Sequence, residues 1–348
     1  MSESWFTYNG NNLKIGSKIL VHIKDSPLPH STLRLLFRDG VTPTFSYGTA
    51  ERVSVSPNIW DLTAPSFNHQ TSWHSLLKNQ TDLLEVIGAG DASYVTTTEK
   101  MFYGCTSLTS IPSLNTVSVE DMTEMFYGCT SLTSIPLTDT GSVELMVRMF
   151  QGCTSLTSLP LLDTSSVTNM GGMFKGCTSL TSIPLIDTSS VNLMSDMFDG
   201  CTSLSSVPLL NTSSVRGMAR MFRGCTSLST IPLFETSLVL GMEAMFNGCT
   251  SLSSVPLLNT GAVSRMSNMF NGCSSLSYIP LFDTNHVMLI DGAFKDCRRV
   301  AGGALDLYNQ ASTQSVTYKP DCFTNCGIDT PTGLAELQQI PASWGGLA

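Results

Sequence analysis

The stretch MFKGCTSLTSIPLIDTSSVNLMSD, residues 173–196, decides the fold because close copies of it follow one another along most of the chain. Its cysteine recurs every 24 residues from Cys105 to Cys297. Eight full copies occupy residues 101–292, and a ninth begins at Ala293. A fixed period of this length indicates one small unit that stacks on itself and buries its apolar side against its neighbours. The sequence therefore predicts a solenoid.

The residue types within each unit predict a helix and a strand. Val191, Met194 and Met197 follow helical spacing, which predicts a short amphipathic helix. Leu204–Val207 has the composition of a short strand, and Pro208 ends it because proline cannot donate a ladder hydrogen bond. The expected fold class is an α/β solenoid, a right-handed coil of short parallel strands and short helices. The recurring apolar positions in this copy are Met173, Phe174, Cys177, Leu180, Ile183, Leu185, Val191 and Met194.

The repeat also carries a family resemblance. The run Phe-x-Gly-Cys-x-Ser-Leu-x-x-Ile-Pro, followed by Asp-Thr-x-x-Val-x-x-Met-x-x-Met-Phe, resembles the BspA-like leucine-rich-repeat surface proteins of bacteria. The match is strong over residues 101–297 and weak over about 70–100 and 298–330. The resemblance implies a leucine-rich-repeat fold and a non-enzymatic role in adhesion, in which the solenoid surface recognises a protein or glycan partner on a cell. It supplies no catalytic residues and names no ligand.

The N-terminus bears on where such a protein acts. It lacks a basic start followed by an apolar run, so no secretory signal peptide is visible, and no stretch is long enough to span a membrane. Related repeats also occur in phage-encoded proteins, so we expect a virion or host-attachment component, or a protein released by an unconventional route. A cytoplasmic location is the alternative. Two other functions stay open: a structural assembly subunit that forms homo-oligomers through its N-terminal domain, and an intracellular protein-interaction scaffold.

Composition excludes several classes of function. The net charge of −9 disfavours nucleic acid as a partner, because phosphates require Lys and Arg. The cysteines lack Cys-x-x-Cys pairs and occupy one apolar position of the repeat, which favours buried, reduced thiols over a metal site. Cys322 and Cys326 are an exception, since Cys322 lies outside the 24-residue series and the two could form a bond. No catalytic constellation is recognisable, and we expect no cofactor, no metal and no enzyme activity.

Three regions are predicted. Residues 1–70 lack the repeat and have β patterns around Asn9-Gly10 and Asp39-Gly40, both favoured hairpin turns, so they should form a small N-terminal β cap or docking domain. Residues 71–330 should form the leucine-rich-repeat solenoid. Residues 331–348 should form a C-terminal cap with a loose tail, and Thr330-Pro331 is a plausible helix start.

Two sets of residues are candidate contact sites. Stacked hydroxyls on the predicted strand face either solvate the sheet or offer a flat surface to a ligand. That set is Thr109, Thr133, Thr157, Thr181, Ser205, Ser229, Ser253 and Tyr278. Variable or basic residues at the helix edge make up the second set, which is Tyr103, Tyr127, Lys175, Arg216, Arg220 and Arg223.

A third row carries an acidic or amide side chain before a threonine in each copy. Such a row suits turn and cap chemistry, or, less well, calcium. The row is Asn115, Asp139, Asp163, Asp187, Asn211, Glu235, Asn259 and Asp283.

Overall fold

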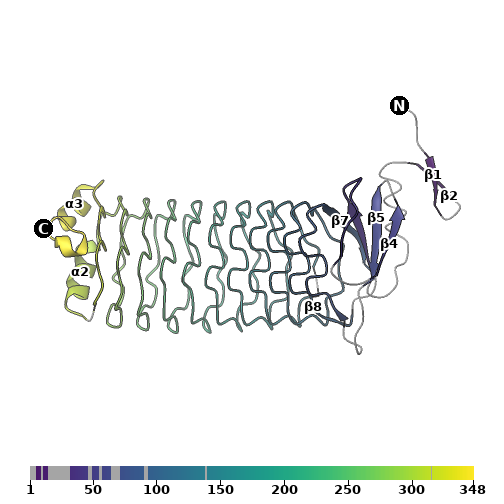
Figure 1. Cartoon of the computed structure of the whole chain (residues 1–348). Helices are drawn as coiled ribbons and strands as arrows, with labels where there is room; N and C mark the ends of the chain where they lie inside the picture. Colours follow the sequence, from purple (N-terminus) through teal and green to yellow (C-terminus); the bar gives the residue numbers. More distant parts are fainter. Residues whose placement is uncertain are drawn as a thin grey trace.

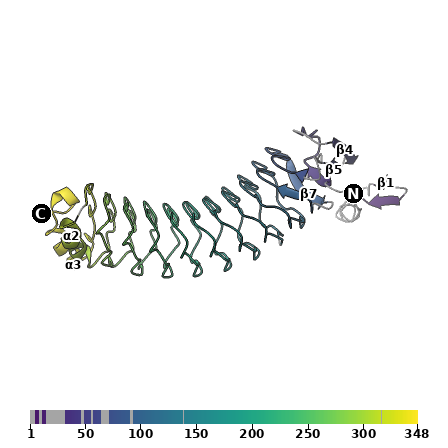
Figure 2. The ribbon, with the colours of Figure 1, turned by 90° about the horizontal axis from the view of Figure 1, so that it is seen from below.

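The computed structural model describes residues 5–8, 11–14, 32–45, 49–54, 57–63, 71–89, 93–137, 139–314 and 316–348. The repeats form coils that lie side by side in a single row between a β head and two C-terminal helices (Figure 1). The row bends along its length (Figure 2). The predicted solenoid is therefore confirmed.

Regular elements occur at the two ends of this row. The strands are β1 Trp5–Tyr8, β2 Asn11–Lys14, β3 Thr32–Phe37, β4 Thr49–Ser54, β5 Asn58–Thr63, β6 Thr71–Ser72, β7 Leu83–Ala89 and β8 Val95–Thr97. The helices are α2 Ala304–Ser312, α3 Pro331–Leu337 and the 3-10 helix η1 Ala342–Trp344.

The short helix predicted in each repeat is wrong: the described residues of 101–292 contain no helix. In residues 194–200, every second amide donates instead to a carbonyl 23 positions further on, at 2.6–3.0 Å. The amides between them close tight turns, such as Met197 N to Met194 O at 3.2 Å. Asp196 (φ 61°) and Gly200 (φ 76°) are left-handed, which a helix does not allow. Tight turns that close at every second residue thus reproduce the apolar spacing of a helix, while the amides between them donate to the next coil.

The strand predicted at Leu204–Val207 is also absent as a regular element. Parallel pairing occurs earlier in the coil, where Leu193 bridges both Asn169 and Gly217 in the adjacent coils. At the predicted strand, Ser205 N donates to Thr181 O at 3.2 Å, which is one isolated bond of the expected kind. The coils are therefore joined by turns and single bridges rather than by a broad parallel sheet.

Identical side chains stack from coil to coil in the interior. Successive phenylalanines from Phe102 to Phe323 lie 5.2–5.8 Å apart between ring centroids, with nearly parallel planes. Each cysteine thiol of the series donates to a backbone carbonyl of the preceding coil, as Cys177 Sγ does to Phe150 O at 3.0 Å. All eleven cysteines are free and buried, Cys322 and Cys326 included. The prediction of reduced, buried thiols is confirmed.

A buried threonine forms a further ladder. Thr188 Oγ1 donates to Asn211 O of the next coil at 2.8 Å, and its equivalents do the same along the array. These threonines are 0–2% exposed, so the hydroxyl satisfies a carbonyl that water cannot reach. The position after the proline differs from the other apolar positions, because Leu185 faces solvent and Ile186 takes the core position.

The head closes one end of the interior. Its sheet has the strand order β4-β5-β3-β7, and the pairing between these neighbours is antiparallel. β7 also belongs to the first coil, since Glu85 bridges Ser110 in parallel. Leu33, Leu35 and Phe37 share one buried cluster with the coils. The expected β structure is present, and it crosses the boundary predicted at residue 70. β1 and β2 pair around Asn9-Gly10, which lies outside the described residues.

The C-terminal segment closes the other end. The predicted helix is confirmed as α3, whose N-cap Thr330 accepts a hydrogen bond from Gly333 N at 3.1 Å. α2 was not predicted and lies where the repeat spacing lengthens. The predicted loose tail is wrong: Trp344 is buried against Tyr308 and Phe323, at 5.4 and 6.3 Å between ring centroids. An aromatic residue therefore covers the last ring of the phenylalanine stack.

Candidate interaction surfaces

The predicted strand-face residues form an exposed row of hydroxyls on the array. Several of these hydroxyls donate to carbonyls of the preceding coil, as Thr109 Oγ1 does to Leu84 O at 3.0 Å and Ser205 Oγ to Thr181 O at 3.4 Å. Tyr278, 54% exposed, projects at the C-terminal end. A hydroxyl that already donates its hydrogen bond to a backbone carbonyl has no proton left to donate to a ligand. The role of this row as a binding site stays a prediction.

Two of the predicted edge residues pair with each other. The rings of Tyr103 and Tyr127 stack at 4.5 Å with an interplanar angle of 5°. Lys78 Nζ also lies over the ring of Tyr103, 4.9 Å from its centroid. The tyrosines thus cover much of each other's aromatic faces.

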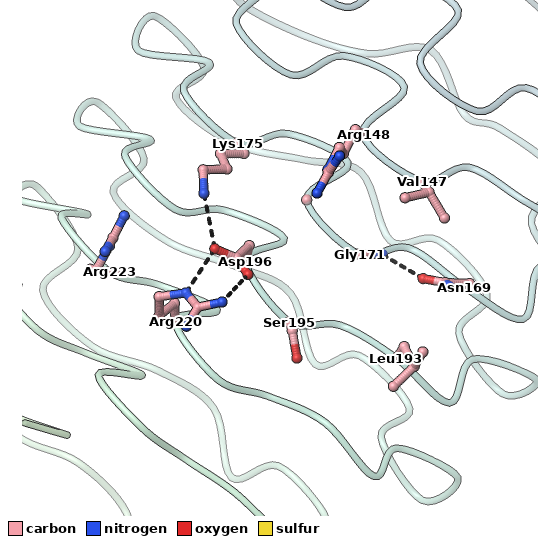
Figure 3. A pocket seen from close by; sticks show the side chains of 11 residues that line it. Val147, Arg148, Asn169, Gly171, Lys175, Leu193, Ser195, Asp196, Arg220 and Arg223 are labelled. Atoms are coloured by element: carbon pink, nitrogen blue, oxygen red, sulfur yellow. Dashed lines mark hydrogen bonds and ion pairs between the residues drawn. The ribbon is translucent and has the colours of Figure 1, made fainter. Parts of the chain in front are cut away.

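The structure brings three of the four remaining edge candidates together around a hollow of about 570 Å³ near the middle of the array (Figure 3). Lys175, Arg220 and Arg223 line it, whereas the predicted Arg216 is exposed but does not. Arg148, which sequence reasoning missed, lies on the other side (Figure 3). The remaining polar wall includes Asp196.

Ion pairs between neighbouring coils hold these cations in place. Arg220 binds Asp196 through two nitrogens at 3.0 and 2.9 Å, and Arg223 binds Asp199 in the same way at 2.8 Å for both bonds. Lys175 Nζ lies between the two carboxylates, 3.0 Å from Asp196 and 2.9 Å from Asp199. Burial raises the pKa of Asp196, but its hydrogen bonds to Arg220 and Lys175 outweigh that effect and lower the pKa overall. Asp196 is therefore ionised at neutral pH.

The acidic and amide row caps the turn that follows it. Asp187 Oδ1 accepts from Ser189 N at 2.9 Å, and Asn211 Oδ1 accepts from Ser213 N at 3.1 Å. Hydrogen bonds from Ser189 lower the pKa of the exposed Asp187. The shared geometry of Asp and Asn confirms the turn interpretation. Within the described residues, no group of three or more His, Cys, Asp and Glu side chains is arranged to hold a metal ion.

A row of leucines was missed as a surface feature. In six consecutive coils the leucine after the proline is 51–69% exposed, and these residues are Leu161, Leu185, Leu209, Leu233, Leu257 and Leu281. Leu161 and Leu185 line a shallow depression of about 370 Å³ together with Asp163 and Asp187. The signal was present in the sequence, because two adjacent apolar residues in an extended segment point to opposite sides.

The buried thiols offer no reactive centre. Burial raises the pKa of Cys177 to about 12, and the other cysteines are raised by the same cause. The thiolate is the nucleophilic form of cysteine, so these groups are inert at neutral pH. Helices in the described part of the chain are too short or too polar to cross a bilayer.

Comparison with known protein families agrees with a repeat architecture. The family described as "Mycoplasma protein of unknown function, DUF285" matches residues 70–183 and 146–257. The BspA type leucine rich repeat region matches residues 219–343. No curated protein matches.

Several of the solved structures similar to this chain are bacterial leucine-rich-repeat proteins. The one from T. pallidum is 27% identical and covers 49% of this chain and 72% of its own, with a TM-score of 0.35. A leucine rich cell surface protein of Faecalibacterium prausnitzii is 17% identical, with coverage of 83% and 94% and a TM-score of 0.34. One from Eubacterium ventriosum is 17% identical, with coverage of 72% and 68% and a TM-score of 0.38. Since the first of the two family models matches residues 70–257, more than half of the chain, this chain belongs to the DUF285 family, and its residues 219–343 match the BspA type leucine rich repeat region.

Proposed function

We propose that this chain is a non-enzymatic binding protein that holds a protein partner along its leucine row. Residues 219–343 match the BspA type leucine rich repeat region, and leucine-rich-repeat proteins generally bind proteins or other ligands and are not enzymes. The solenoid supplies a long surface on which equivalent positions repeat, and such surfaces suit extended partners. The partner would lie across several coils rather than in a deep pocket.

The exposure of six consecutive leucines is the observation that carries the proposal. With coils about 5 Å apart, the row is roughly 25 Å long. Full burial of one leucine side chain stabilises a complex by about 1.5–3 kcal/mol, so a partner that covers the row gains considerably. Contiguous exposed apolar surface on a folded protein commonly marks an interaction site.

Charge beside the row indicates the partner's chemistry. Exposed acidic residues lie two positions after four of the leucines, and these are Asp163, Asp187, Glu235 and Asp283. Their carboxylates would meet Lys or Arg on a complementary partner. A second copy of this chain would place the same acidic row against it. We therefore favour a partner that presents apolar side chains flanked by basic ones.

The attachment role expected from the family resemblance fits this proposal. The partner, with its apolar and basic side chains, would then be on a cell surface, and this chain would be on another cell or on a virion. The alternative of a structural assembly subunit predicts self-association instead. The alternative of an intracellular scaffold predicts the same type of partner inside the cell. Light scattering of the purified protein separates the first alternative, since the proposal requires no self-association through the row.

A displayed library of random peptides tests the proposed surface. Selection should enrich peptides that combine apolar residues with Lys or Arg. A Leu185→Ser, Leu209→Ser, Leu233→Ser variant should bind the selected peptides at least ten-fold more weakly, because each lost contact costs about 1 kcal/mol or more. A matched variant of the hydroxyl row, Ser205→Ala with Ser229→Ala, should bind as the original chain does. Enrichment of acidic peptides, no enrichment, or equal loss in both variants would contradict the proposal.

A further inference from the structure

The hollow of about 570 Å³ shares no lining residue with the depression on the leucine row, so it is a separate feature of the array. Its volume falls within the range of small-ligand pockets, about 300–1,000 Å³. The coils that form the hollow have the same types of interior residue as the coils on either side. The difference therefore comes from the side chains on the outside.

A pair of glycines creates the hollow. Gly171 and Gly172 stand where the preceding coil has Val147 and Arg148, and where the following coil has Ser195 and Asp196. Gly172 is left-handed at φ 63°, and a Cβ there would lie 3.1 Å from Arg148 Cγ. The missing side chains leave open the space that Arg148, Lys175 and Arg220 surround (Figure 3).

The hollow is locally positive on an acidic protein. Arg148, Lys175, Arg220 and Arg223 face two carboxylates, Asp196 and Asp199, which leaves an excess of two positive charges. Glu124 lies 3.3 Å from Arg148 and 3.8 Å from Lys100, so this carboxylate is shared between two cations and offsets only part of the excess. The chain as a whole carries a net charge of −9. A single anionic group fits this balance.

Arg148 is the cation best placed to bind it. Its side chain is 57% exposed. It forms an ion pair with Glu124 through one nitrogen, Nη1, at 3.3 Å. Arg220 and Arg223 each use two nitrogens on a carboxylate, so they are more fully engaged. A guanidinium can hold a carboxylate through two parallel hydrogen bonds, which makes the interaction directional as well as strong.

Neutral polar groups around the hollow favour a ligand that also carries hydroxyls. Asn169 and Ser195 line the wall. Next to it, the Gln151 Oε1 atom is buried and has no hydrogen-bond partner among the described residues. This atom lies 3.8 Å from the position of a Cβ on Gly172, just behind the surface that lines the hollow.

An acidic protein surface is a poorer fit than a small acidic molecule. It would bring many negative charges towards a chain of net charge −9, whereas a single carboxylate meets the local positive charge alone. We propose that the hollow above Gly171 and Gly172 binds an acidic sugar residue, with its carboxylate on Arg148 and its hydroxyls on the neutral wall. The site adds glycan recognition to the protein binding proposed for the leucine row.

Titration calorimetry on the full chain tests the site with named probes. Glucuronic acid or N-acetylneuraminic acid should bind, and glucose, which lacks the carboxylate, should not. Arg148→Gln should weaken binding of the acidic sugar at least ten-fold, because a hydrogen bond to a charged group contributes about 1.5–3 kcal/mol. Arg265→Gln is the matched control, since Arg265 is an exposed, ion-paired arginine outside the hollow, and it should change nothing.

A second variant tests the cavity itself. Gly171→Val should abolish binding while the fold is retained, because Val147 already occupies the equivalent position of the preceding coil. The triple leucine variant should keep full sugar binding, so the two proposals can fail separately. Equal binding of sulfate or hexaglutamate would show a site for any anion and would overturn the proposal. No binding of either acidic sugar, or unchanged binding in Gly171→Val, would overturn it too.

Discussion

The inside and the outside of the same coils follow opposite rules. Inside, Phe198 lies between Phe174 and Phe222 at 5.5 Å on each side, so each ring packs against copies of itself. Outside, three consecutive coils carry Val147, Gly171 and Ser195 at one equivalent position. A stacked interior constrains each residue through both neighbours, whereas an exterior position meets mainly water. The side chains that recur inside every coil therefore stabilise the fold, whereas the exterior side chains that vary from coil to coil are the ones available for recognition.

The largest effect on the shared interior should come from alkaline pH. Burial raises the pKa of Cys177 from about 9 to about 12, so the folded state keeps a proton that the unfolded state releases. The stabilisation is complete below pH 9 and is lost as the pH rises towards 12, by about 1.4 kcal/mol per pH unit for each thiol. Because eleven buried thiols add, the urea midpoint followed by circular dichroism should fall steeply above pH 9. A midpoint that stays constant up to pH 11 would show that the thiols are not buried.

Removal of one interior ring should have the next largest effect. Phe198→Ala leaves a gap between two stacked phenylalanines and should lower the free energy of unfolding by about 3–5 kcal/mol. Leu209→Ala on the exterior, where the side chain is 62% exposed, should change it by less than about 0.5 kcal/mol. Urea denaturation of both variants measures the difference. Similar losses in the two would remove the distinction between interior and exterior.

The smallest of the interior effects should come from one hydroxyl. Thr188→Val keeps the shape but removes the bond to Asn211 O, and should cost about 1–3 kcal/mol because the buried carbonyl loses its donor. The exposed Ser190 donates to Ser165 O at 2.9 Å, and Ser190→Ala should cost less than about 0.5 kcal/mol because water replaces the donor. Thermal unfolding at pH 7 compares them. An equal cost would mean that burial does not decide the value of these bonds.

Much of the interior could be predicted from the sequence. The 24-residue spacing indicated which residues stack, because one-dimensional repetition places equivalent positions in contact. The helix at Val191–Phe198 could not be separated from a run of turns by spacing alone. The left-handed backbone of Asp196 distinguishes the run of turns from a helix. Aspartate tolerates this conformation, but its presence in the sequence does not predict it.

The candidate sites were harder to predict than the core. Lys175, Arg220 and Arg223 were recognised as an exposed group, but their pairing with Asp196 and Asp199 depends on the stacking of coils. The hollow exists because Gly171 and Gly172 have no side chains. This could be noticed in the sequence only by comparing these two positions with the equivalent residues of the neighbouring repeats. The leucine row was hard to recognise because each of its residues is followed directly by a core residue, in the runs Pro-Leu-Leu, Pro-Leu-Ile and Pro-Leu-Phe.

The interchangeable interior has a consequence for how such a chain can vary. Because the Phe, Cys, Met and Val side chains inside Met173–Asp196 recur in the coils on either side, excision or duplication of 24 residues leaves the interior stacks in register, although exterior ion pairs such as Arg220–Asp196 change. Unequal exchange between repeats in the gene can therefore lengthen or shorten the protein in whole steps. Each step alters how many leucines stand in line and how far the hollow lies from either terminus, while both end caps still fit.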